Sequence, residues 1–140
     1  MYAKTSAAAA KRPEAIQVDP VLAPRRIETN RPFERGDVES AIRHFTAAVE
    51  RSPAFGEACH NLGVALLQAG RPADAIAPLR RAADLLPQDA GNYNSLGIAY
   101  ARTARFDEAR AAFERAVGLD PARSEYRINL DGLRPFRGGR

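Results

Sequence analysis

Apolar residues recur at three- and four-residue spacing in two neighbouring stretches, residues 58–69 and 72–86. In the first stretch they are Leu62, Ala65, Leu66 and Ala69. In the second they are Ala75, Ile76, Leu79, Ala82 and Ala83. This spacing places the apolar side chains on one face of a helix and leaves polar residues on the other. The pattern therefore predicts two amphipathic helices in succession.

Glycine and proline mark where these helices begin and end. Gly70 and Arg71 separate the two apolar stretches. Pro72 suits the first turn of the second helix, because its missing N–H has no partner there. We expect Pro87, and Pro121 further along, each to end the second of two successive helices, since the residue before proline avoids the α region. Two helices joined by so tight a turn form an antiparallel pair.

The whole pair recurs 34 residues further along, so that segment 58–89 aligns with segment 92–123. The matched residues are Leu62 with Leu96, Gly63 with Gly97, Ala65 with Ala99, Ala75 with Ala109, Leu79 with Phe113, Ala82 with Ala116 and Pro87 with Pro121. Upstream, the same offset reaches Ala41, Phe45, Ala48 and Pro53, and downstream it reaches Leu130. A fixed period of this length is typical of helical repeat proteins.

The pattern resembles the tetratricopeptide repeat family over residues 36–133. The Leu-Gly pairs, the alanine that follows them and the Ala, Phe or Leu, Ala, Pro series carry the resemblance. It implies an all-α protein, a short right-handed α-solenoid of antiparallel helix pairs with a C-terminal capping helix. It also implies a protein-binding module or adaptor rather than an enzyme.

The predicted domain boundaries follow from this register. We expect an irregular or disordered tail at 1–21, a repeat domain at 22–133 and a basic tail at 134–140. Within the domain we expect a degenerate repeat at 22–55, complete repeats at 56–89 and 90–123, and a capping helix at 124–133. Pro24 and Pro32 leave at most a short helix before Arg31.

Glycine and proline also occur inside the predicted helices. Gly97 lies inside a first helix, where glycine costs about 1 kcal/mol against alanine. We expect Gly63 and Gly97 to let the paired helix cross closely, against Ala75 and Ala109, so that Gly97→Leu destabilises strongly. Pro78 lies inside a second helix and is expected to kink it.

The resemblance implies that the first helices line a concave groove. Residues of these helices that are not needed for packing are the candidate peptide-binding residues. In the first complete repeat they are Glu57, His60, Asn61, Val64, Leu67 and Gln68. In the second they are Asn94, Ser95, Ile98, Ala101 and Arg102. The capping helix, which Ser124 is expected to cap, adds Glu125, Ile128 and Asn129.

Asn61, Ser95 and Asn129 form a polar row spaced by the repeat. Amide side chains both donate and accept hydrogen bonds, so they suit a peptide backbone. Some bacterial and glycosyltransferase-linked members of the family use an asparagine ladder in this way, and Ser95 interrupts the row here. Ordinary solvated residues remain the alternative interpretation.

An apolar strip in the same predicted groove suits a hydrophobic or amphipathic segment. The strip consists of Val64, Leu67 and Ile98. The carboxylate clamp of chaperone-binding members needs a set of lysine, arginine and asparagine residues on this surface. No lysine occurs beyond Lys11, and the groove positions hold His60 and Val64 instead. We therefore do not expect a chaperone-tail binder of that kind.

The net charge of +4 lies in the tails. Residues 1–35 carry seven basic and four acidic residues, and residues 36–123 carry ten and eleven. Residues 124–140 carry four and two. A nucleic-acid binder usually shows a basic stripe on its folded body, so nucleic acid is not the expected partner. Binding through the basic tails stays open as an alternative, and it would depend steeply on salt.

No catalytic or metal-binding motif occurs in the sequence. Cys59 and His60 are helix neighbours that point in different directions, and Cys59 is expected in the core. The single cysteine excludes an internal disulfide, and no stretch resembles a signal peptide or a membrane span. We expect a soluble, cytoplasmic protein with no enzymatic activity, no cofactor and no metal.

The partner is expected to be another protein, and a homodimer is the second possibility. The helix from Val38 to Arg51 lacks a sound first helix before it. Its apolar side, which includes Ile42, Phe45 and Val49, is expected to be exposed and to invite a homodimer or a covering by the N-terminal tail.

Overall fold

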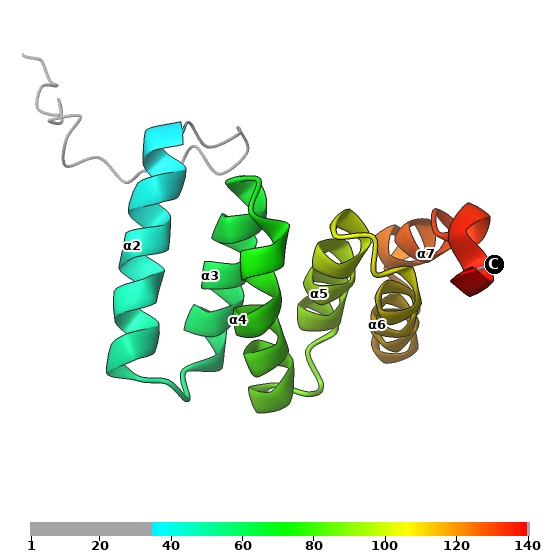
Figure 1. Ribbon diagram of the computed structural model, residues 1–140. Coiled ribbons are helices and arrows are strands. Elements are labelled where there is room, and N and C mark those ends of the chain that lie inside the picture. Colours follow the sequence, from blue (N-terminus) through cyan, green and yellow to red (C-terminus); the bar gives the residue numbers. More distant parts are fainter. Residues whose placement is uncertain (1–34, 140) are drawn as a thin grey trace, which may run out of the picture. The chain divides into compact units, whose positions relative to one another are not determined.

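The computed structural model describes residues 35–139 of the 140-residue chain. In order, its elements are α2 (Arg35–Arg51), α3 (Gly56–Gln68), α4 (Pro72–Leu85), α5 (Ala90–Arg102), α6 (Phe106–Leu119), α7 (Ser124–Asp131) and the 3₁₀ helix η2 (Arg134–Gly139) (Figure 1). No strand occurs within these residues, so the all-α prediction is confirmed. The predictions for residues 1–34 lie outside the described part.

Each helix packs on the helices next to it in the sequence. The closest pairs are α3 with α4 and α5 with α6, which are the two predicted repeats. α4 also packs on α5, α2 on α3, and α6 on α7. Such nearest-neighbour packing is what stacked repeats produce. We call α3, α5 and α7 the first helices, and α2, α4 and α6 the second helices.

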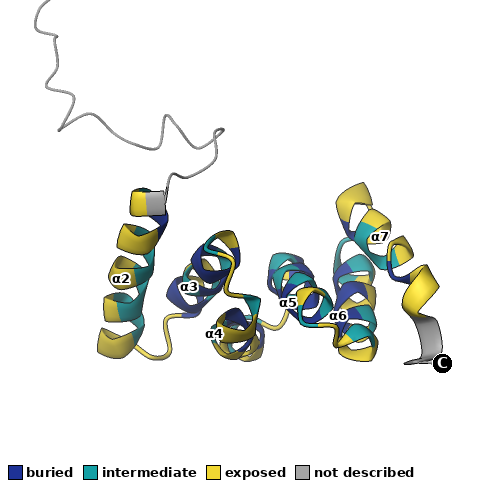
Figure 2. Cartoon of the chain, turned by 45° about the horizontal axis from the view of Figure 1, so that its top comes forward, coloured by how far each residue is buried: buried dark blue, intermediate teal, exposed yellow. Residues whose placement is uncertain are grey.

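The core lies between the paired helices, where the repeat-matched apolar residues meet. Leu79 and Ala82 in α4 are fully buried, and Phe113 in α6 is 2% exposed. In Figure 2 the buried residues face neighbouring helices, and the exposed residues cover the outer sides. Cys59 is also fully buried, which confirms its predicted place in the core.

The two mid-helix glycines do permit a close approach, but the prediction of what they face was wrong. A Cβ atom on Gly97 would lie 2.5 Å from Cε1 of Phe113, and one on Gly63 would overlap the Leu79 side chain. The sequence pattern predicted Ala109 opposite Gly97. Side chains on a helix point back toward its N-terminus, so Phe113, one turn after Ala109, covers the position opposite Gly97.

Pro78 does not divide its helix. α4 runs from Pro72 to Leu85 with Pro78 inside it, and the Pro78 side chain is half-buried. Proline lacks an N–H, so the carbonyl of Asp74 loses one intrahelical partner.

The C-terminal end packs back on the last repeat. Leu133, the last residue of the predicted capping segment, is buried in the main core cluster, and η2, which lies within the predicted tail, packs on α6. The Phe136 ring stacks on Phe106 with centroids 4.3 Å apart. Ser124 is the first residue of α7 rather than its cap, a position that Arg123 occupies.

Candidate peptide-binding groove

A recess of about 120 Å³ lies where the N-terminal half of α3 meets the loop between α4 and α5. α3 contributes Glu57, His60 and Asn61 to its lining, and the loop contributes Leu86 and Asp89. The three α3 residues fall on one helix face, because they are three and four positions apart. The structure therefore brings three of the predicted groove residues together.

Two side chains hold the loop of this recess in place. Asp89 caps α5, and its Oδ1 accepts a hydrogen bond of 2.9 Å from the Gly91 amide. Asn92 is fully buried, and its Nδ2 donates to the carbonyl oxygens of Ala82 at 3.2 Å and Leu86 at 3.4 Å. Both carbonyls lie at the end of α4 and also accept backbone amides, Ala82 that of Leu86 and Leu86 that of Asp89, so Asn92 adds a second hydrogen bond to each. The carboxylate of Asp89 thus belongs to a fixed loop.

His60 lies half-buried beside this loop. Desolvation lowers its pKa below the usual value, whereas the charge of Asp89 and hydrogen bonding to Asn92 act in the opposite direction. Neither His60 Nδ1 nor Asn92 Oδ1 has a partner at good hydrogen-bond geometry within the described residues. At neutral pH the imidazole is mostly uncharged.

Two hydrogen bonds link successive first helices. Nδ2 of Asn129 in α7 donates to Oδ1 of Asn94 in α5 at 2.8 Å. Nη1 of Arg102 in α5 donates to the carbonyl oxygen of Leu67 in α3 at 3.2 Å. α3, α5 and α7 thus follow one another along one face of the molecule. We call the side of α3, α5 and α7 that carries the candidate residues the predicted groove.

Two of the candidates do not offer a free side chain, and their assignment was wrong in that respect. Leu67 is 7% exposed and belongs to the main core cluster with Leu96 and Tyr100. Neighbouring first helices approach closely enough to enclose it. Asn94 is also 7% exposed, and its side-chain oxygen Oδ1 already accepts a hydrogen bond from Asn129.

The remaining candidates stay accessible to different degrees. The exposed ones are Glu57, Asn61, Gln68, Arg102, Glu125 and Ile128. The half-buried ones are His60, Val64, Ser95, Ile98, Ala101 and Asn129. Within the predicted asparagine row, Asn61 is free on the surface, whereas the Asn129 donor already serves Asn94.

Sequence reasoning missed three residues of this region: Leu86, Asp89 and Asn92. Asp89 carries a recognisable signal, because aspartate just before a helix is a favoured N-cap. The role of Asn92 has no local signal, since its partners are carbonyls of the preceding helix. An asparagine in an amphipathic helix is as compatible with solvent as with a buried cap.

Cys59 and His44 show no catalytic arrangement. Cys59 is fully buried, and burial raises the pKa of its thiol, which disfavours the reactive thiolate. Its Sγ lies 3.9 Å from the carbonyl oxygen of Pro53. His44 is exposed on α2, in another part of the molecule. Within residues 35–139, no three metal-ligating side chains gather.

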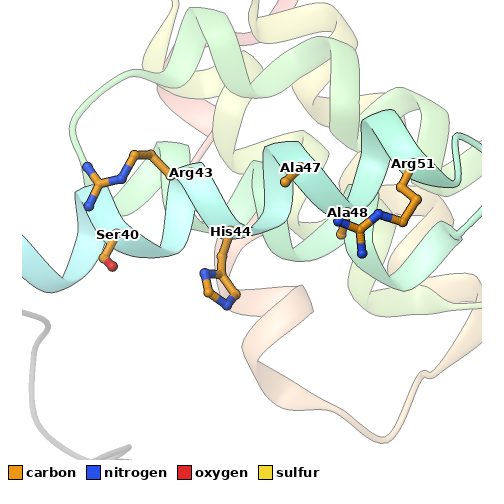
Figure 3. Close-up of a pocket in the computed structure, with 6 residues that line it drawn as sticks. All are labelled: Ser40, Arg43, His44, Ala47, Ala48 and Arg51. Carbon is orange, nitrogen blue, oxygen red and sulfur yellow. The ribbon is translucent and has the colours of Figure 1, made fainter.

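A second recess, of about 360 Å³, lies along α2. The described residues that line it are Ser40, Arg43, His44, Ala47, Ala48 and Arg51, all from this one helix (Figure 3). They form a basic face without an opposing set of functional groups in the described part.

Comparisons with known proteins agree with this geometry. The tetratricopeptide repeat, as two family models describe it, matches residues 33–90 and residues 66–130. The Hsp70-Hsp90 organizing protein of Triticum aestivum is 32% identical over 101 residues, which are 72% of this chain and 17% of that protein. A small glutamine-rich tetratricopeptide repeat-containing protein of Mycosarcoma maydis is 28% identical over 97 residues, 69% of this chain and 28% of that protein. The chain thus spans less than a third of either relative.

Solved structures show the same arrangement of helices. The crystal structure of MamA has a TM-score of 0.70 and 27% identity, covering 74% of this chain and 61% of that one. The first TPR domain of Spaghetti (RPAP3), solved with the HSP90 peptide SRMEEVD, has a TM-score of 0.68 and 22% identity, covering 77% and 86%. The described helices also include none long and apolar enough to cross a membrane. The predicted α-solenoid is confirmed, and the chain belongs to the tetratricopeptide repeat family.

Proposed function

We propose that this chain is a protein-binding module that holds an extended peptide or a helical segment of a partner in the predicted groove. The supporting observation is that equivalent positions of three first helices stay accessible while side-chain bonds link those helices to one another. A prearranged surface of this kind binds a segment without first having to become ordered. The RPAP3 domain, which shares the fold, was solved with a peptide of its partner.

The surface chemistry supports recognition rather than catalysis. Most of the accessible candidates are amides, carboxylates and aliphatic side chains, with His60, Ser95 and Arg102 beside them, and the buried Cys59 lies outside the groove. We infer that the chain needs no cofactor and acts as an adaptor. Because lysine is absent from the described residues, the acidic chaperone tails recognised by clamp-type members are not the expected ligands.

Selection from a random peptide library displayed on phage tests this proposal directly. Peptides selected on the full chain are expected to bind at least about tenfold more weakly to an Asn61→Ala, Ile128→Ala double variant. Both side chains are exposed, so helicity and melting temperature should stay unchanged. Glu39→Ala with Glu114→Ala, on the second helices, serves as the control. Equal binding to the groove variant would remove the groove as the binding surface.

Self-association through α2 is a second candidate. Ile42, Phe45 and Val49 are half-buried, although the matching positions of α4, Ile76, Leu79 and Ala83, are buried. A second copy could bury the remainder of this apolar side. Static light scattering on the full chain should then show a dimer that a Phe45→Ser variant weakens. A monomer at high concentration would exclude this candidate.

A further inference from the structure

Three carboxylates stand at the same end of the first helices. Glu57 and Glu125 are the second residues of α3 and α7, and they are separated by two repeat lengths. In α5 the second residue is Gly91, and Asp89 immediately before the helix supplies the carboxylate. All three acidic side chains are exposed. We call Glu57, Asp89 and Glu125 the acidic rim of the predicted groove.

The rim carboxylates lie close enough to act on the same neighbours. Glu57 and Asp89 line one recess. Asp89 also influences residues of both adjacent first helices, because its charge partly offsets the burial that lowers the pKa of His60 in α3 and adds to the raised pKa of Tyr126 in α7. For Tyr126 burial is the largest cause, Arg123 opposes it, and Glu125 adds to it. The negative charge therefore extends along the rim from α3 to α7.

Positive charge near this rim is already engaged or lies on another face. Nε of Arg81 donates to the Pro53 carbonyl oxygen before α3, and Arg127, two residues after Glu125, lies on another face of α7. The Arg123 guanidinium is 4.0 Å from Glu125 and 3.8 Å from Asp120, so two carboxylates share it at long distances. His60, the nearest basic side chain of α3 in the recess, is mostly uncharged at neutral pH because burial lowers its pKa. Arg102 lies at the other end of α5 and bonds the Leu67 carbonyl.

Apolar groups follow the rim along the same helix faces. Ile128 is three residues after Glu125 and is 67% exposed, the most exposed large apolar side chain described. Val64 is seven residues after Glu57, two helical turns along the same face, and Ile98 is the matching residue of α5. Each first helix thus presents an acidic end followed by an aliphatic residue.

From this arrangement we propose that the groove selects a protein segment in which lysine or arginine side chains meet the acidic rim and aliphatic side chains rest on Val64, Ile98 and Ile128. This inference rests on the proposed function and names the chemistry of its ligand. An acidic segment would place its carboxylates against three others, and like charges at such distances repel. Exposed ion pairs are individually weak, so the preference arises from several acting together.

Two labelled peptides of equal length test the charge preference by fluorescence anisotropy. Both carry leucine and valine at the same positions, and they differ only in having lysine or glutamate at every charged position. The lysine peptide is expected to bind the full chain at least about tenfold more tightly at low salt. Added salt should reduce that preference, because the rim is exposed.

A matched pair of variants locates the effect. Glu57→Gln with Glu125→Gln should reduce the preference for the lysine peptide to about threefold or less. Glu39→Gln with Glu114→Gln changes the net charge equally on α2 and α6, and it should leave the preference intact. An unchanged preference in the rim variant, or an equal loss in the control, would overturn the inference.

The inference and the proposed function fail in different ways. If library selection yields groove-binding peptides that are acidic or uncharged, the acidic-rim inference is overturned and the binding function stands. If the library yields no binder and neither labelled peptide binds, the proposed function fails and the inference falls with it. Enrichment of basic and aliphatic residues among the selected peptides supports both.

Discussion

The same repeat position is buried to different degrees at the two ends of the described helices. Phe45 in α2 and Phe113 in α6 are two repeat lengths apart, yet Phe113 is 2% exposed and Phe45 is half-buried. At the C-terminal end α5, α7 and η2 all pack on α6, whereas α2 packs on α3 (Figure 2). The repeat pattern thus determines which face a side chain occupies, and the neighbouring helices determine how far it is buried.

The largest predicted effect comes from truncating these two phenylalanines. Phe113→Ala should lower the free energy of unfolding by about 3–5 kcal/mol, because it leaves a cavity in a fully packed core. Phe45→Ala should cost about 1–2 kcal/mol, because less apolar surface is buried there. Chemical denaturation followed by circular dichroism measures both values. Equal losses would show that the two ends are packed alike and would remove the comparison.

A smaller effect is predicted for an added methyl group next to Phe113. The Cβ atom of Gly97→Ala would lie 2.5 Å from Cε1 and 2.6 Å from Cδ1 of the Phe113 ring, so we expect a loss of about 1–3 kcal/mol. Gly118→Ala is the matched control, because nothing lies within 4 Å of its Cβ position. It should stabilise α6 by about 0.5–1 kcal/mol. Thermal unfolding of the two variants should therefore shift in opposite directions.

The sequence was sufficient for features that repeat. The 34-residue period predicted the helix pairs, their order and the need for small residues at Gly63 and Gly97. These features come from local periodicity and backbone preferences, which depend only on the residues of each segment. The identity of the facing side chain depends on rotamer direction, and so Phe113 was missed in favour of Ala109.

Features that occur once could not be predicted in the same way. The burial of Leu67 depends on how closely α3 approaches α5, and the packing of Phe136 depends on where the chain turns after α7. Asn92 is buried because it bonds two carbonyls of the preceding helix, a contact that no periodic pattern shows. In the acidic rim, Asp89 lies two residues before the repeat position that Glu57 and Glu125 occupy, so the 34-residue period does not point to it.

The next prediction compares two half-exposed phenylalanines at opposite ends. Phe136 is 47% exposed and stacks on Phe106, whereas Phe55 is 49% exposed, with no stacked ring found beside it in the described part. Phe136→Ala should therefore cost about 0.5–1.5 kcal/mol more than Phe55→Ala. Denaturation midpoints measure the difference. A Phe55→Ala loss as large as that of Phe136→Ala would show that the stacked pair adds nothing at the C-terminal end.

The smallest predicted effect concerns His60, inside the first complete repeat. Burial lowers the pKa of His60 below its usual value of 6.5, so below that pH the unfolded chain binds the proton more readily than the folded one. The contribution of His60 to stability is therefore fully present above about pH 6.5 and is lost as the pH falls through its folded-state pKa.

Melting temperatures measured between about pH 7 and pH 5.5 test this linkage. His60→Gln should flatten the fall in melting temperature relative to the wild type. The effect is small because His60 remains partly accessible and the charge of Asp89 opposes the desolvation. If the variant keeps the wild-type slope, the proton is accepted equally well in the folded and unfolded chains. His60 would then be well solvated, and the recess beside Asp89 would be open to water.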